Sequence, residues 1–341
     1  MTNRGFTLTE LLIAMGVGVF LISVSVTLHV VNLNQFRSTE LRSYMAQDSL
    51  LLSDFFRTKI MAVGGGPIRG WMGLWPENNC NARLFMPNCL GSDRLSMSTL
   101  RFPIQSCAVT GQPLPNRIQA AFVAPGVCCL SAANPGEVDF DNRHAMLVLG
   151  DFYRQVYLTN LNAGTCQADM SAGQAAGGDS FGGLPNWTGG TVSLVDVETY
   201  FVDPTTHQLN QFIDANNNNV ADTNEVAAIV DGVFDLQVAL GYDFAISDGN
   251  IAEAADGSND EWLFNNPTTA EIFGIGYFAP PLNRNQLLMV AVGTILGTQD
   301  KNTPVGLLET SLLDGPLRKE DGWVLQGQVA QAAPRNSYVF Q

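Results

Sequence analysis

The feature that most constrains the fold of this chain is a run of apolar residues near its beginning. Residues 11–31 contain no charged side chain, and the charge-free stretch extends to residue 36. About 20 such residues are enough for an α-helix to cross the hydrocarbon of a bilayer. No small-x-small cleavage pattern follows the run, because polar or bulky residues come next. We therefore expect a retained transmembrane helix over about 11–31.

A single carboxylate, Glu10, stands at the edge of this run. A charged side chain inside a membrane costs about 2.5 to 3.5 kcal/mol on insertion scales, so it usually has a partner. A buried carboxylate is tolerable where it pairs with a buried ammonium group. The alternative is local, because Thr7-x-x-Glu10 has the spacing of a capping box. The sequence therefore predicts that Glu10 either pairs with an ammonium group of another molecule or caps its own helix.

The helical pattern continues beyond the membrane-spanning part. Three glycines and a proline at 64–67 predict its end. We expect one helix over 6–61, about 84 Å long at 1.5 Å per residue, whose second half packs on a globular head. A coiled coil is the alternative, but the stripe is too short and broad for one. The apolar positions that recur three and four apart are Leu33, Phe36, Leu41, Tyr44, Met45, Leu51, Leu52, Phe55, Phe56 and Ile60.

After residue 67 the texture changes to short apolar runs between Gly, Pro and Asn clusters, which is typical of strands. A long helix followed by a mainly antiparallel sheet is an α+β arrangement. We expect the head to span 62–341. The candidate strands are 94–102, 145–149, 155–159, 192–201, 208–213, 233–240 and 287–295.

The net charge of −15 is concentrated in one part of the chain. No Lys or Arg occurs between Arg154 and Arg284, whereas 17 acidic residues lie within 169–271. Nucleic-acid binders usually neutralise phosphates with basic side chains, so we expect no nucleic-acid partner. Abundant carboxylates also leave open a membrane-tethered hydrolase, but no motif arranges two of them as acid and base. We therefore expect no enzymatic activity.

The cysteines predict disulfides. All six lie within 80–166 and none forms a C-x-x-C pair. Behind a membrane-export segment, an even number indicates bonds formed outside the cytoplasm, and the vicinal pair should bond to different partners. Sequence leaves the connectivity open, and three scattered histidines leave little material for a zinc site. The candidates are Cys80, Cys89, Cys107, Cys128, Cys129 and Cys166.

Residues 214–225 have the ligand spacing of an EF-hand calcium loop. Oxygen side chains fall at positions 1, 3, 5, 9 and 12, and position 7 offers a backbone carbonyl. Position 6 is Asn219 rather than Gly, and the flanks are strand-like rather than helical. The segment predicts a Ca²⁺ site, with an Asn-rich hairpin turn as the alternative. The candidate ligands are Asp214, Asn216, Asn218, Val220, Asp222 and Glu225.

The segment Arg4-Gly5-Phe6-Thr7-Leu8-Thr9-Glu10 resembles the class III signal of type IV prepilins and type II secretion pseudopilins. The resemblance implies that residues 1–5 are a leader and that a prepilin peptidase cuts after Gly5. It implies methylation of the new amino group of Phe6. It also implies that Glu10 neutralises the amino group of a neighbouring subunit during filament assembly.

Segments of the head resemble the PilW family of type IV minor pilins. They are Gly91-Ser92-Asp93-Arg94-Leu95 and residues 229–238, followed by Gly241-Tyr242-Asp243. The resemblance implies a pilin-like fold and a minor pilin that joins a priming or tip complex with major and minor pilins. It implies an inner-membrane anchor, a periplasmic head and later a place in the surface pilus. A type II secretion pseudopilin is the alternative.

Overall fold

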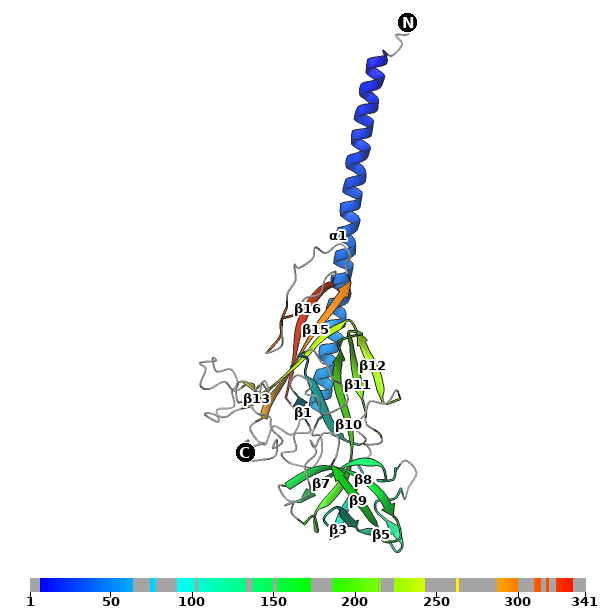
Figure 1. Ribbon diagram of the computed structural model, residues 1–341, viewed down its shortest axis with the longest axis vertical. Coiled ribbons are helices and arrows are strands. Elements are labelled where there is room, and N and C mark those ends of the chain that lie inside the picture. Colours follow the sequence, from blue (N-terminus) through cyan, green and yellow to red (C-terminus); the bar gives the residue numbers. More distant parts are fainter. Residues whose placement is uncertain are drawn as a thin grey trace.

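Figure 1 shows the computed structural model, a long helix that enters an elongated head made of strands. The structure describes residues 7–63, 74–77, 91–101, 104–132, 137–149, 152–172, 186–213, 215, 224–242, 262–263, 287–299, 310–313, 317–318 and 323–333. A long apolar helix followed by a mainly antiparallel sheet domain confirms the α+β prediction at that level.

Helix α1 (Leu8–Ala62) confirms the single long helix that the apolar pattern predicts. Its 55 residues include no proline, which would break the backbone ladder, and they span about 82 Å at 1.5 Å per residue. The helix ends where Val63 turns extended and its N–H bonds to the carbonyls of Lys59 and Ile60. Its first half projects away from the head (Figure 1).

Part of the larger sheet closes into a barrel at the end of the head farthest from the N-terminus (Figure 1). The strands run in the order β10-β3-β4-β9-β8-β7, and β7 pairs again with β10, so all six lie in one ring. We call this unit the distal barrel. Its strands are β3 (Ser106–Leu114), β4 (Arg117–Ala120), β7 (Arg143–Leu149), β8 (Phe152–Asn162), β9 (Gln167–Ala172) and β10 (Thr191–Asp203).

The short strands β5 (Phe122–Ala124) and β6 (Val127–Cys128) pair with each other as a separate hairpin. The remaining strands form a second unit around the lower half of α1, which we call the proximal unit. Its strands are β1 (Leu74–Glu77), β2 (Arg94–Leu100), β11 (Gln208–Phe212), β12 (Val226–Asp231), β13 (Val233–Tyr242), β14 (Trp262–Leu263), β15 (Leu287–Gln299) and β16 (Trp323–Ala332). Strand β10 joins the two units, because its first residues pair with β3 and β7 and its later residues pair with β2 and β11.

Each unit has its own hydrophobic core. In the proximal unit, helix residues such as Phe56 and Ile60 pack with side chains from both sheets, including Leu95 and Leu236. The core of the distal barrel has no helix and is filled by strand residues and Trp187. A helix with one apolar stripe and a sheet with one apolar face bury those surfaces together, whereas a closed barrel buries its inner face by itself.

All seven predicted strands exist, with ends that differ by a few residues. The prediction missed β3, β4 and β9 of the distal barrel, the short strands β5 and β6, and also β1, β12, β14 and β16. Strand β3 buries only Cys107 and Val109 among polar neighbours, so its apolar signal is weak. Strand β16 is a different case, because its alternating sequence WVLQGQVAQA carries a period-two signal.

Candidate functional site

The start of α1 carries the capping box that was the local alternative for Glu10. The backbone N–H of Thr7 donates to Oε2 of Glu10 at 2.9 Å, and the N–H of Glu10 donates to Oγ1 of Thr7 at 3.3 Å. Two backbone donors that lack helical partners are thereby satisfied. Gly5 and Phe6 lie outside the described residues.

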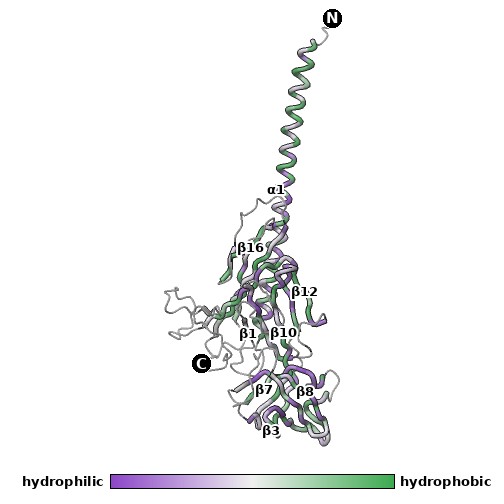
Figure 2. Tube along the Cα trace, in the orientation of Figure 1, coloured by the Kyte–Doolittle hydropathy of each residue, from purple (hydrophilic) through white to green (hydrophobic). Residues whose placement is uncertain are grey.

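Most residues in the first half of α1 are apolar (Figure 2), and their side chains are exposed. Within the described residues it is the one helix long and apolar enough to cross a membrane. The hydroxyls of Ser23 and Thr27 donate to the carbonyls four residues earlier, at 2.9 and 2.8 Å. Such bonds give these two hydroxyls a partner where water is absent. This segment has the composition of a single-pass membrane anchor.

The second half of α1 contacts the head over a shorter stretch than predicted. Burial begins at Met45 and continues through Ser49, Leu52, Phe56 and Ile60, at spacings of four and three residues. Several other residues of the predicted apolar stripe are not buried against the head. Exposed side chains that we expected to pack on the head are Leu33, Phe36, Tyr44 and Leu51.

A polar cluster fixes the helix to β10. The ammonium group of Lys59 lies 2.6 Å from Oε2 of Glu198, and the hydroxyl of Tyr200 donates to the same oxygen. Burial, together with the hydrogen bond to Glu198, raises the pKa of Tyr200. The phenol therefore stays a neutral donor, and the rings of Phe55 and Phe56 pack edge-on against it. The helix is held at this point by apolar and polar contacts.

An open groove of 260 Å³ runs between α1 and β12. It is mostly apolar, and Leu51 at its border is 70% exposed. Its lining residues are Asp48, Leu51, Leu52, Phe55, Ile229 and Val230.

Residues 91–95 and residues 229–238 meet in space although about 140 residues separate them. The N–H of Asp93 donates to the carbonyl of Leu236 at 2.7 Å, and the N–H of Val238 donates to Oδ2 of Asp93 at 2.8 Å. The side-chain amide of Gln237 donates to the carbonyl of Gly91 at 2.8 Å. These bonds tie the start of β2 to β13, and so they join the two sheets of the proximal unit.

A buried carboxylate lies at the centre of this junction. Oδ1 of Asp235 accepts from the hydroxyl of Ser92 at 2.6 Å and from the guanidinium of Arg318 at 3.0 Å. Asp235 is fully buried and Ser92 is 1% exposed, so a substrate does not reach this hydroxyl. A buried ion pair with further hydrogen bonds is a structural arrangement that fixes one geometry. We assign the cluster to the architecture of the head and not to catalysis.

Gly232 in the second segment is required by a close backbone approach. Its φ is +74°, and an added Cβ would lie 2.6 Å from the carbonyl oxygen of Gly297. Only glycine adopts this conformation without cost and leaves space for the neighbouring strand.

The predicted calcium loop lies at the turn of the hairpin formed by β11 and β12. Five of the candidate ligands, Asp214, Asn216, Asn218, Val220 and Asp222, lie outside the described residues. The sixth, Glu225, is 8% exposed, and its Oε1 accepts from the N–H of Ala215 at 3.0 Å. Among the residues that the structure describes, its buried Oε2 has no hydrogen-bond partner. Within the described parts of the chain, no group of three or more His, Cys, Asp or Glu is arranged to hold a metal ion.

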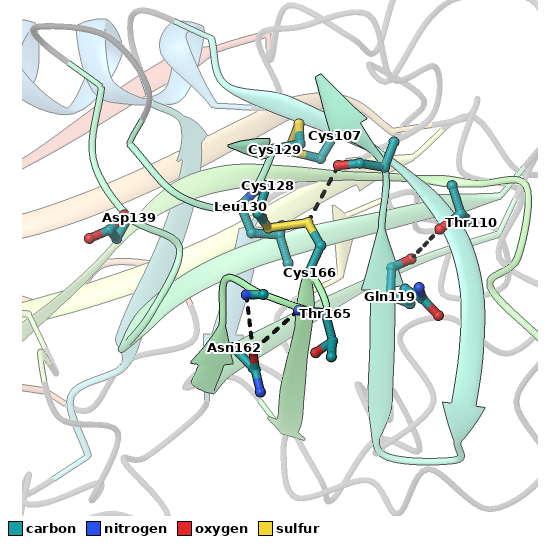
Figure 3. Close-up of a disulfide and its surroundings, with 12 residues drawn as sticks. Cys107, Thr110, Gln119, Cys128, Cys129, Leu130, Asp139, Asn162, Thr165 and Cys166 are labelled. Carbon is teal, nitrogen blue, oxygen red and sulfur yellow. Dashed lines mark hydrogen bonds between the residues drawn. A yellow bond between two sulfur atoms is a disulfide. The ribbon is translucent and has the colours of Figure 1, made fainter. Parts of the chain in front are cut away.

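Disulfides confirm that the vicinal cysteines bond to different partners. Cys129 is bonded to Cys107, and Cys128 is bonded to Cys166 (Figure 3). The other two candidates, Cys80 and Cys89, lie outside the described residues. Sequence alone could not select these pairs, because the strand pairing of the distal barrel brings them together.

Comparison of the chain with known protein families, with curated proteins and with solved structures finds no match in any of the three.

Proposed function

We propose that the protein is a minor pilin that joins the priming or tip complex of a type IV pilus. The observation that carries the proposal is the division of α1. Its first half is exposed and apolar, whereas from Met45 onward one face of the helix packs on the head. A helix of this kind can be stored in the inner membrane and then packed against the helices of other pilins, since both surroundings bury apolar surface.

Processing of the N-terminus is the first step of this function. A prepilin peptidase cuts after Gly5 and the new amino group of Phe6 is methylated. Cleavage leaves Thr7 one residue from the new end. Glu10 then faces the amino group of a neighbouring subunit, where a carboxylate and an ammonium group compensate each other in an apolar filament core.

Mass spectrometry of the chain isolated from its own cells tests this step. We expect a mature N-terminus that begins with methylated Phe6, and an uncut chain in Gly5→Asp. In Glu10→Gln we expect normal cleavage but loss of the chain from sheared pili. Glu40→Gln, which removes an exposed carboxylate farther along the same helix, is the matched control and should still enter pili. Uncut wild-type chain contradicts the proposal.

A deletion strain separates a pilus from a type II secretion system. We expect surface pili and twitching to be lost and enzyme secretion to continue. The opposite result, with pili intact and secretion abolished, assigns the chain to the pseudopilins.

The head of this pilin binds Ca²⁺ at the β11–β12 turn in our proposal. Glu225 fits the role of the bidentate ligand at position 12, because its Oε2 is buried and lacks a protein partner. Oxygen groups at the preceding positions supply the hard ligands that calcium requires. Binding would also neutralise part of the acidic segment 169–271.

The melting temperature of the full chain in detergent tests the calcium site. At a calcium concentration a hundredfold above Kd, we expect about 2.7 kcal/mol of added stability. Asp214→Ala should lose the stabilisation by calcium. Asp256→Ala should keep it, because Asp256 belongs to another acidic cluster of the segment 169–271 that lacks the ligand spacing. Equal melting temperatures of the wild type with calcium and with chelator contradict the site.

A further inference from the structure

Strand β12 forms an open edge of the larger sheet. It pairs with β11 and with no other strand that the structure describes, and it lies at the margin of the head (Figure 1). The carbonyl of Glu225 accepts from the N–H of Ile213 at 3.0 Å, so the backbone of Glu225 points toward β11. Because successive residues of a strand point their backbone groups to opposite sides, those of Val226 and Ala228 point away from β11. These groups have no hydrogen-bond partner among the described residues.

A β-bulge turns the end of this strand toward the helix. Ile229 is the extra residue between the pairs Asn210–Ala228 and Leu209–Val230. An extra residue interrupts the alternation of side chains, and the consecutive residues Ile229 and Val230 both line the groove against α1. The open edge of β12 therefore borders an apolar groove.

Helix α1 forms the opposite wall of this groove. Leu51 and Phe55 lie one turn apart in the lining, and the side chain of Leu51 is 70% exposed. An extended segment laid along β12 would cover Leu51 and would also give partners to the outward backbone groups of the strand. One ligand, a β-strand, therefore satisfies both the apolar wall and the polar edge.

Charge selects the kind of segment that fits. Asp48, which lines the groove, and Asp231, which ends β12, are both exposed. The ammonium group of Lys59, one turn beyond Phe55, is paired with Glu198 at 2.6 Å. Pairing of this edge with the same edge of a second copy would bring like charges together, which is destabilising. A segment that carries Lys or Arg is attracted instead.

We propose that the β12 edge binds an extended segment of another protein, with apolar side chains at alternate positions and Lys or Arg between them. The segment pairs with Val226 and Ala228 as an added strand, and its apolar side chains pack on Leu51. Main-chain bonds supply affinity, while the groove and Asp48 select the side chains. This inference goes beyond the pilin proposal and does not depend on it.

Peptide binding to the full chain in phospholipid nanodiscs tests the inference. The probe is a fluorescent, end-capped eight-residue peptide that alternates valine with lysine, and its binding is followed by fluorescence anisotropy. We expect saturable binding to the wild type. Leu51→Ser should weaken it on the order of tenfold, because an apolar contact is lost. Ala228→Pro should weaken it about fivefold, since proline removes one outward N–H and is tolerated on an edge strand.

Two controls separate strand addition from general attraction to an acidic protein. Leu50→Ser alters a neighbouring side chain that is 65% exposed and does not line the groove, and it should bind the peptide like the wild type. The same peptide with every backbone nitrogen methylated keeps its charges but has no N–H donor, and it should bind on the order of tenfold more weakly.

The inference is overturned if the wild type does not bind the peptide, or if Leu50→Ser and Leu51→Ser bind it equally well. Equal binding of the methylated and the parent peptide overturns strand addition. A dimer of the chain that Leu51→Ser dissociates overturns the choice of another protein as the partner.

Discussion

The proximal unit and the distal barrel solve the same problem of core formation in different ways. In the proximal unit, α1 lies in a core shared with strands of both sheets, and the junction around Asp235 links those sheets. The distal barrel has no helix, closes its sheet on itself and carries two disulfides. The comparison teaches that the helix is essential to one half of the head only.

The largest effect that separates the two units should come from Phe56→Ala. Phe56 is 1% exposed in the proximal core, and removing a buried ring of this kind costs about 3 to 5 kcal/mol. Hydrogen exchange should become faster in β13 and β15 and stay unchanged in β7 and β8. Phe36→Ala, which truncates a side chain that is 68% exposed, is the control. Equal acceleration in both units would show that they unfold together.

Removal of one disulfide should destabilise the distal barrel and leave the proximal unit unchanged. The Cys128–Cys166 bond closes a sequence separation of 38 residues, for which the chain-entropy relation gives about 4 kcal/mol. In Cys128→Ala with Cys166→Ala we expect faster exchange in the distal barrel and unchanged exchange along the lower half of α1. If the distal barrel of this double variant melts as in the wild type, the Cys128–Cys166 bond does not stabilise the barrel.

The smallest effect concerns an ion pair on the surface of the distal barrel. The guanidinium of Arg117 lies 2.6 Å from Oδ1 of Asp169, and this hydrogen bond lowers the pKa of Asp169. A lowered folded-state pKa gives stability that is fully present above the unfolded value of about 3.9 and is lost as the pH falls through the folded value.

Melting of Asp169→Asn against the wild type measures this contribution. The wild type should be slightly more stable at neutral pH, and the difference should disappear as the pH falls below about 4. Asn lacks the titrating group, so its own curve should be flatter there. A difference that is constant over the whole range means that the ion pair does not act through the charge of Asp169.

Sequence was most informative where the pattern was long or the residues were strongly apolar. The charge-free run at 11–31 and the periodic positions after it were sufficient to predict α1, and seven strands with apolar runs were found. The extent of helix burial was wrong, because Tyr44 and Leu51 satisfy the periodicity but lie on the face that the head does not cover. Periodicity identifies the apolar stripe of a helix but does not show which part of the stripe the head covers.

The features of the candidate sites likewise divide into those that the sequence determined and those that required the tertiary structure. Sequence alone determined the apolar helix, the positions of Gly5, Phe6 and Glu10, the ligand spacing up to Glu225, and the rule that vicinal cysteines bond apart. Tertiary structure decided the disulfide partners, the meeting of Ser92 with Asp235 and Arg318, and the exposure of Phe122 and Val123 in the β5–β6 hairpin. The reason is physical, since local periodicity and spacing act along the chain. Strand pairing and barrel closure bring together residues that can be more than 100 positions apart.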